Sequence, residues 1–239
     1  MAVAVSAPVP NMKTMDIRLP DEVPVMTLPN CVFFPQALMP LHIYEPRYRR
    51  MLKDVLATDR IFVVAGLDLK LAGTPEQFEP PHHVATLGII RACQENANGT
   101  ANLLLQGLAR VGIEQILREE PYRRIAVRPL LSAPGAKAAD LRILQSDLMR
   151  LITLKQKLGV EVAEEMADFL RGVDDPDTCV DLAAFSMCED AKLKQRLLET
   201  LDTFRRFQLF NAKLKVEIEE IKLQKKLQGH LSDDDIAQN

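Results

Sequence analysis

Residues 30–52 constrain this chain more than any other stretch, because they read as a short strand that runs directly into a helix. Along the expected strand, Leu38 to Tyr44, successive side chains point to opposite faces. Pro46 then suits the first position of a helix, since its fixed φ is already helical and its missing N–H has no partner there. A carboxylate beside that terminus, Glu45, is favoured by the helix dipole. The stretch therefore predicts a β-to-α junction, with a helix over 46–58.

The expected helix has one apolar stripe, because its apolar residues recur at spacings of three and four. These residues are Tyr48, Met51, Leu52, Val55 and Leu56. Basic residues occupy the remaining faces, at Arg47, Arg49, Arg50 and Lys53. One side of this helix is therefore expected to pack on a core.

Recurring prolines rule out a helix between residues 23 and 41 and leave only short extended pieces. They are Pro24, Pro29, Pro35 and Pro40. Downstream, short β-branched or alternating runs bounded by turn residues predict further strands. Strands are expected at 25–28, 38–44, 61–66, 84–92, 101–105, 109–117 and 122–131, with a long loop over 67–83. Residues 23–131 thus predict a small, closed or strongly coiled β domain with one helix.

The character of the chain changes after residues 132–135, SAPG, since no β-rich segment follows them. Leucines now recur at helical spacing, and Gly159 and Gly172 each end a helix. Asp175 followed by Pro176 begins another, as a capping carboxylate and a first-turn proline. Helices are expected at 141–158, 162–171, 176–187, 190–201 and 203–228. The last would be roughly 40 Å long at ~1.5 Å per residue.

The segment 33–52, FFPQALMPLHIYEPRYRRML, closely resembles the opening of the Lon protease N-terminal (substrate-binding) domain. The family pattern there is an aromatic–Pro pair and then Leu-Pro-Leu-His-Ile-Phe-Glu-Pro-Arg-Tyr-Arg, from which Met39 and Tyr44 are mild departures. GlyLeuAlaArg at 107–110 is similar to a strand entry of the same family, and the lysine- and leucine-rich segments after residue 191 are similar to its long C-terminal helix. The resemblance implies an α+β fold, with a PUA-like β-barrel domain followed by an α-helical bundle that ends in a long helix.

The expected domain organisation is a flexible arm over 1–22, the PUA-like β domain over 23–131 and a helical subdomain over 136–239. In Lon proteases an ATPase and a protease domain follow this region. Here we find no GxxxxGK[ST] phosphate loop and no nucleophile elbow around any serine. We therefore expect a stand-alone, non-enzymatic protein with no catalytic residues and no cofactor.

Charge and cysteine usage narrow the class of protein further. A net charge of −3 argues against a general nucleic-acid or membrane binder. The four cysteines are scattered without a CxxC pair, and neither a signal peptide nor a run of transmembrane length is visible. Free thiols in a reducing cytoplasm are expected. His82 and His83 have no further ligand nearby in sequence, so no metal site is expected.

An apolar part of the signature segment has two interpretations. Phe33, Phe34, Leu38 and Met39 lie on a proline-interrupted stretch that is too irregular to bury every side chain. They either pack in the core or form an exposed apolar groove, which would bind unfolded segments because desolvation is non-directional. Flexible methionine would help such a surface adapt.

The polar residues of the signature also have two interpretations. His42 and Tyr44 share one face of the strand, where His42 serves either as a hydrogen-bonded structural residue or as a binding contact. Glu45 either orients Arg47 or Arg50, or caps the helix, or contacts a partner. We count Phe33, Phe34, Met39, His42, Tyr44, Glu45, Arg47 and Arg50 as candidate protein-binding residues.

The leading hypothesis is a module that binds unfolded or degron-bearing polypeptides, with a protease complex as a further partner, in a monomer or homodimer. The alternative is RNA binding by the PUA-like domain, through Arg123, Arg124 and Arg128 together with the arginines of the helix over 46–58. Few aromatic residues accompany these arginines, so nucleic acid is the less favoured partner. A small-molecule pocket is a third class, for which no convergent set of acid, base or metal ligands is found.

Overall fold

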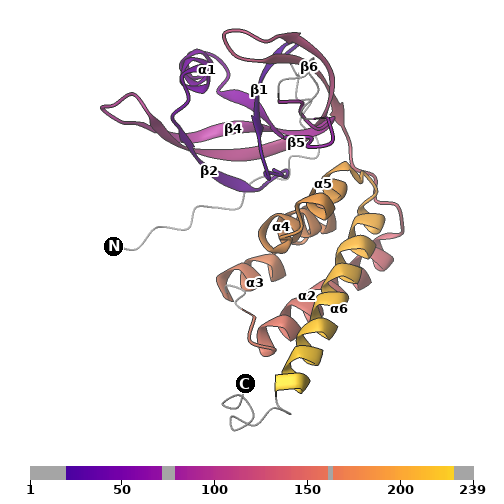
Figure 1. The fold of residues 1–239 in the computed structure, drawn as a ribbon. Coiled ribbons are helices and arrows are strands. Elements are labelled where there is room, and N and C mark those ends of the chain that lie inside the picture. The colour runs from indigo at the N-terminus through magenta and orange to yellow at the C-terminus, as the bar shows by residue number, and fades with distance from the viewer. Residues whose placement is uncertain (1–19, 72–78, 161–163, 229–239) are drawn as a thin grey trace, which may run out of the picture.

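The structure of the chain, a computed structural model, describes residues 20–71, 79–160 and 164–228. A β domain comes first and a helical bundle follows it (Figure 1). The β domain consists of β1 (Val23–Leu28), β2 (Leu38–Ile43), α1 (Pro46–Leu56), β3 (Ile61–Gly66), β4 (Val84–Glu95), β5 (Ala101–Arg118) and β6 (Arg124–Leu130). The bundle consists of α2 (Ala138–Lys157), α3 (Glu164–Arg171), α4 (Pro176–Met187), α5 (Ala191–Glu199) and α6 (Thr203–Gln228). The expected α+β fold is confirmed, while most of the predicted arm over 1–22 lies outside the described residues.

Five strands close into a barrel. β1 pairs with β3 in parallel, β3, β4, β5 and β6 then pair antiparallel in that order, and β6 returns to β1. β2 lies outside this circuit and pairs with the first part of β5. Closure removes the free edges of the circuit and leaves β2 as the terminal strand of the sheet.

β5 is one continuous strand of 18 residues, so the prediction of two strands, 101–105 and 109–117, was wrong. A glycine at position 107 suggested a break, but the strand runs through it. The part up to Gln106 pairs with β2, and the part from Arg110 pairs with β6. The pairing of β5 with β4 and with β6 contains register shifts. These shifts allow β5 to bend, so that its two parts can pair with different strands.

Two apolar clusters lie on opposite faces of the barrel wall, as the period of two along a strand dictates. In β1, Val25 belongs to one cluster and Met26 to the other. The smaller cluster draws on the five circuit strands and fills the barrel interior. Its members are Val23, Val25, Val63, Ala65, Ala85, Leu87, Val111 and Ile125. The larger cluster continues from the outer face of the wall into α1 and the helical bundle.

The helices bury the faces that their apolar spacing predicts. In α1, Tyr48, Met51, Leu52 and Val55 are buried, although Leu56 is only half-buried. The Tyr48 hydroxyl donates to the Thr27 carbonyl at 3.2 Å, which ties α1 to β1. α6 runs for 26 residues beside α2, as Figure 1 shows, and confirms the predicted long helix. It buries Phe207, Phe210, Leu214 and Ile218.

The loop between β1 and β2 is buried where the two halves of the molecule meet. The Phe33 ring meets Phe185 of α4 edge-on, with 6.3 Å between ring centroids. Phe34 is fully buried, and the Arg110 guanidinium lies 5.9 Å from its ring centroid. Both phenylalanines therefore pack in the core between the β domain and the bundle.

A buried ionic network also joins the β domain to the bundle. Asp181 of α4 accepts from Arg110 of β5 at 2.6 Å and from Arg206 of α6 at 2.5 Å. These three side chains are at most 2% exposed. Arg206 also lies 3.0 Å from Asp177, and its guanidinium donates to the Ser132 hydroxyl at 3.0 Å. The network has the pairing that buried charges require.

Asp177 makes the stability of this network depend on pH. Burial alone would raise the pKa of its carboxyl, but Arg206, the Thr203 hydroxyl and Arg110 outweigh burial, and the pKa is lowered. A carboxyl whose pKa is lower in the folded state adds stability above its unfolded pKa, and this stability is lost as the pH falls through the folded pKa. We therefore expect Asp177→Asn to lower the free energy of unfolding at pH 7. The difference from wild type should shrink below about pH 4.

Urea unfolding of wild type and Asp177→Asn at pH 7 and at pH 3 measures this difference directly. A difference that stays the same at both pH values would show that Asp177 does not titrate between them.

Candidate protein-binding surface

The side chains of β2 point alternately to solvent and to the core. Along it Leu38, Pro40 and His42 are exposed, while Met39 and Ile43 are buried. The buried side packs on the larger core cluster. The exposed side is the face on which the sequence placed His42 and Tyr44.

Cross-strand pairing extends this exposed row onto β5 and β4. Pro40 lies opposite the half-buried Leu104, which in turn lies opposite the exposed Ala92. His42 lies opposite Asn102, and the His42 Nδ1 and Asn102 Oδ1 atoms are 2.7 Å apart. Paired residues share one face of a sheet, so these side chains form a continuous surface.

Tyr44 continues the row beyond the end of the strand. Its ring stacks on His42, with 6.2 Å between centroids and 22° between planes. Leu38 is 51% exposed and Tyr44 is 63% exposed, so both ends of the row offer apolar area to solvent. We call this the β2 surface, defined by Leu38, Pro40, His42, Tyr44, Ala92, Asn102 and Leu104.

Of the two interpretations of the apolar stretch, core packing holds for Phe33, Phe34 and Met39, and the exposed groove does not. Phe33, Phe34 and Met39 are 1%, 0% and 8% exposed. The two phenylalanines pack between the domains, and Met39 points from β2 into the core, because its neighbours in the strand take the outer face. Of the apolar candidates in this stretch, only Leu38 reaches solvent.

The remaining candidates, Glu45, Arg47 and Arg50, lie at the start of α1, where Glu45 and Arg47 pair with each other. Arg47 lies 2.9 Å from Glu45 and 2.7 Å from Glu79, which belongs to the loop before β4. The hydrogen bonds that Arg47 donates to the Glu79 carboxylate raise the pKa of Arg47 and keep it charged. Glu45 makes no capping hydrogen bond, so it orients Arg47 rather than capping α1. Arg50 instead pairs with Asp54 at 3.2 Å.

Three of the arginines considered for RNA binding, those of the β domain outside α1, have carboxylate partners. Arg123 lies 2.9 Å from Glu119, Arg124 lies 2.5 Å from Glu22, and Arg128 lies 3.7 Å from Glu114. Neutralised cations release few counterions from a nucleic acid, and this release supplies most of the non-specific affinity. The arrangement does not favour a nucleic-acid surface.

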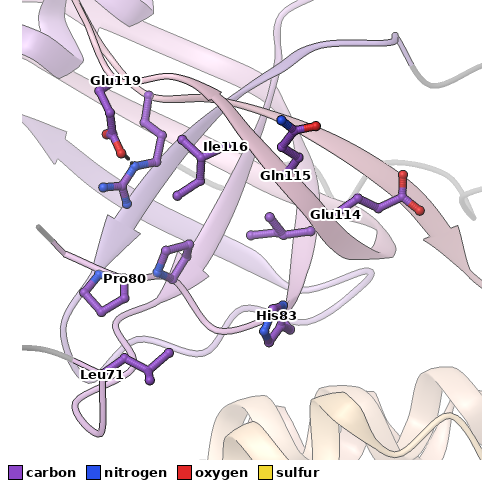
Figure 2. A pocket seen from close by; sticks show the side chains of 10 residues that line it. Leu71, Pro80, His83, Glu114, Gln115, Ile116 and Glu119 are labelled. Carbon is purple, nitrogen blue, oxygen red and sulfur yellow. Dashed lines mark hydrogen bonds and ion pairs between the residues drawn. The ribbon is translucent and has the colours of Figure 1, made fainter. Parts of the chain in front are cut away.

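A pocket that the sequence did not indicate lies between the β3–β4 loop and β5 (Figure 2). Its volume is about 180 Å³. Leu71, Pro80, Pro81, Ile113 and Ile116 supply its apolar lining, and His83, Glu114, Gln115, Glu119 and Arg123 supply its polar lining. Ile116 is 40% exposed and lies in the last part of β5, residues 114–118, all of which are exposed. Consecutive apolar residues at 116 and 117 were the only signal in the sequence.

Metal-ligating groups and thiols can be located in the part of the chain that the structure describes. No cluster of three or more His, Cys, Asp or Glu residues suited to a metal ion is found there. The four cysteines are free, as expected, and burial raises the pKa of Cys31 and of Cys179 to about 11. Such thiols are protonated at neutral pH and are weak nucleophiles. Among the helices of 20–71, 79–160 and 164–228, none has the length and apolar character needed to span a bilayer.

Comparison of the sequence with known families gives one match, over residues 22–215, to the ATP-dependent protease La (LON) substrate-binding domain. The Lon protease of Syntrophus aciditrophicus is 27% identical over 219 residues, which are 91% of this chain and 28% of that protein. Lon protease 2 of Thermus thermophilus is 27% identical over 220 residues, 90% of this chain and 27% of that protein. The chain thus spans little more than a quarter of these relatives.

Solved structures similar to this one are N-terminal domains. The N-terminal domain of the Mycobacterium avium complex Lon protease has a TM-score of 0.62 at 16% identity, covering 81% of this chain and 98% of that one. The Lon N-terminal domain protein from Xanthomonas campestris has a TM-score of 0.57 at 17% identity, covering 80% and 97%. At such identities the likeness concerns the fold.

Proposed function

Because the chain belongs to the family of the ATP-dependent protease La (LON) substrate-binding domain, we propose that it is a non-enzymatic module that binds unfolded or degron-bearing polypeptides. The observation that carries the proposal is the β2 surface, an exposed apolar row inside the part of the chain that matches the family. Polypeptides in protein quality control, or a protease complex that receives them, are the partners that the family suggests.

The chemistry of the β2 surface suits unfolded clients. Leu38, Pro40 and Tyr44 offer apolar contact without a charged group among them, and apolar contact tolerates many client sequences. Unfolded chains expose the apolar side chains that folded proteins bury. A surface of this kind therefore selects for the unfolded state of a client more than for its sequence.

Binding without cleavage also fits the extent of the family match. The similarity to Lon proteases lies within about a quarter of their length and falls on their substrate-binding domain. The described residues hold no metal cluster, and the thiols of Cys31 and Cys179 are held protonated by burial. These observations support recognition as the activity of this chain.

A titration tests the proposed function. Reduced and carbamidomethylated α-lactalbumin, which cannot refold, carries a fluorophore and is titrated with the purified chain while anisotropy is recorded. We expect saturable binding, and suppression of aggregation when a heat-denatured protein is added instead. A chain that neither binds the probe nor suppresses aggregation would refute the proposed function.

Charge placed on the β2 surface should weaken client binding. Leu38→Asp replaces an apolar side chain that is half exposed with a hydrated carboxylate, and burying a leucine is worth about 1.5–3 kcal/mol. We expect at least a tenfold rise in the Kd for the unfolded probe, since about 1.4 kcal/mol is tenfold. The matched control is Ile143→Asp on α2, where the side chain is 66% exposed and lies outside the β2 surface. Equal losses in both variants would mean that general surface hydrophobicity, and not this surface, binds the client.

A further inference from the structure

β2 has an open edge in the described part of the chain. It is the terminal strand of the sheet, and β5 is its single strand neighbour among the described residues. In Figure 1 it lies along the margin of the β domain that is nearest the helices in that view. The main-chain groups on its other side therefore have no strand to pair with among the residues that the structure describes.

Hydrogen bonds just before the strand show which main-chain groups face that open edge. The Ala37 carbonyl accepts from the Gly107 N–H at 2.9 Å, and residue 37 continues the register in which Leu38 lies opposite Gln106. Pairs that bond across an antiparallel ladder alternate with pairs that do not. Residues 39, 41 and 43 therefore bond to β5, whereas Leu38, Pro40 and His42 direct their main-chain groups away from it.

The open edge therefore offers two donors and three acceptors. Within 20–71, 79–160 and 164–228, no strand pairs with the N–H and C=O of Leu38 and His42 on this side, and Pro40 offers only its carbonyl there, because proline lacks an N–H. Proline at this position is compatible with an edge strand. These groups repeat every second residue, a spacing of about 6.8 Å, which matches the repeat of another extended chain.

We propose that an extended segment of the client polypeptide adds to this edge as a further β-strand, beside the β2 surface. This inference rests on the proposed function and states how the client is held. Main-chain hydrogen bonds give affinity that does not depend on client sequence, because every residue except proline has the same donor and acceptor. Folded proteins are disfavoured, since most of their main-chain groups are already paired.

The side chains beside the open edge add a preference for certain client sequences. An added strand places alternate side chains next to Leu38 and Pro40 on the outer face, and the others next to the half-buried Leu41. All three of these residues are apolar. The preferred client segment is therefore extended, free of proline and apolar at alternate positions.

Pro40 favours a client over a second copy of this chain. Two β2 strands paired antiparallel about a twofold axis through the middle of the edge would place Pro40 opposite Pro40. Neither residue has an N–H, so the central pair would form no hydrogen bond. A client residue other than proline at that place donates its N–H to the Pro40 carbonyl and fills the gap.

A main-chain substitution tests the proposal. His42→Pro removes the donor at position 42, and His42→Ala is the matched control that loses the same side chain but keeps the N–H. We expect the unfolded α-lactalbumin probe to bind His42→Pro about tenfold more weakly than His42→Ala, because the client carbonyl opposite loses its partner. Melting temperatures of the two variants establish that both are folded. Equal affinity in two folded variants would overturn the added strand.

Amide exchange of the unmodified chain gives a second measurement that does not depend on variant folding. Followed by NMR, the N–H groups of Leu38 and His42 should exchange at least tenfold more slowly at saturating probe. The N–H of Leu41, which already faces β5, should not change. If the probe binds and exchange at Leu38 and His42 is unaltered, the added strand is wrong and the proposed function stands. If the probe does not bind, the added strand and the proposed function are both wrong.

Light scattering of the free protein tests whether a second copy of this chain occupies the open edge. A mass of two chains that falls to one in His42→Pro would show that a second copy fills the edge, and this would overturn the assignment to a client.

Discussion

Replacing Asp181 with alanine is expected to lower the free energy of unfolding by about 3–5 kcal/mol, because it leaves buried charges without their partner. The Asp181 carboxylate accepts from two arginines, Arg110 and Arg206, and each of the three side chains is at most 2% exposed. Asp177 would remain as the only carboxylate paired with Arg206 among the described residues. Denaturant unfolding measures the change, with an unaltered slope expected if the unfolded chain is as open as before.

A surface carboxylate of the same kind is the control. Asp168 on α3 pairs with Arg171 but is 64% exposed, and ion pairs of that sort contribute little. Asp168→Ala should change the free energy of unfolding by less than about 1 kcal/mol. A similarly small change in Asp181→Ala would mean that water or other acceptors satisfy Arg110 and Arg206.

The Asp181 network joins the strand beside β2 to the bundle. Arg110 belongs to β5, the same strand whose first part pairs with β2, while Asp181 and Arg206 belong to α4 and α6. The network therefore holds the strand beneath the β2 surface against the helices. We expect a destabilised network to loosen both domains together rather than the bundle alone.

Local sequence patterns predicted those helices and strands whose buried face follows from the spacing of their own apolar residues. The stripe of α1 and the proline at its first position gave a helix within two residues of the observed end, and the stripe of α6 predicted its burial. Closure of the barrel followed from the number of short strands and from the resemblance to a known domain. Helices and strands of this kind are specified by neighbours three, four or two residues away.

Contacts between distant residues were outside the reach of those patterns. Phe33 and Phe34 could pack or be exposed, and only their contacts with the bundle place them in the core. The two roles of β5 depend on which strands flank it, so a glycine at 107 was taken for a break. The partners of Asp181 are 71 and 25 residues away in sequence, and nothing local identifies them. The shared face of His42 and Tyr44 could be predicted because alternation along β2 is local.

Replacing Gly107 with alanine is expected to lower the free energy of unfolding by about 3 kcal/mol, near the upper end of what overpacking usually costs. A Cβ at this position would lie 2.1 Å from the Phe34 carbonyl oxygen and 3.0 Å from Pro35 Cα, and both belong to the main chain. Neither can rotate away as a side chain would. The β1–β2 loop would have to move, together with the hydrogen bond from Gly107 N–H to the Ala37 carbonyl.

Gly112 provides the control in the same strand. A Cβ there would meet the Arg128 side chain at 3.5 Å and Leu130 Cδ1 at 3.6 Å, which are ordinary contacts with side chains. Gly112→Ala should leave the free energy of unfolding unchanged or raise it by up to about 1 kcal/mol, because alanine has less freedom in the unfolded chain. Denaturant unfolding compares both variants with wild type. If Gly107→Ala is as stable as Gly112→Ala, the loop is free to move and does not fix the start of β2.

Client binding should follow the same order, because the loop that Gly107 supports leads directly into Leu38. A displaced loop shifts the first donor and acceptor of the open edge and the first apolar side chain of the β2 surface at once. We expect Gly107→Ala, at a temperature where it remains folded, to bind the unfolded probe at least about tenfold more weakly than Gly112→Ala, the loss expected when a hydrogen bond and an apolar contact fail together. Equal binding by two folded variants would show that the start of β2 takes no part in holding the client.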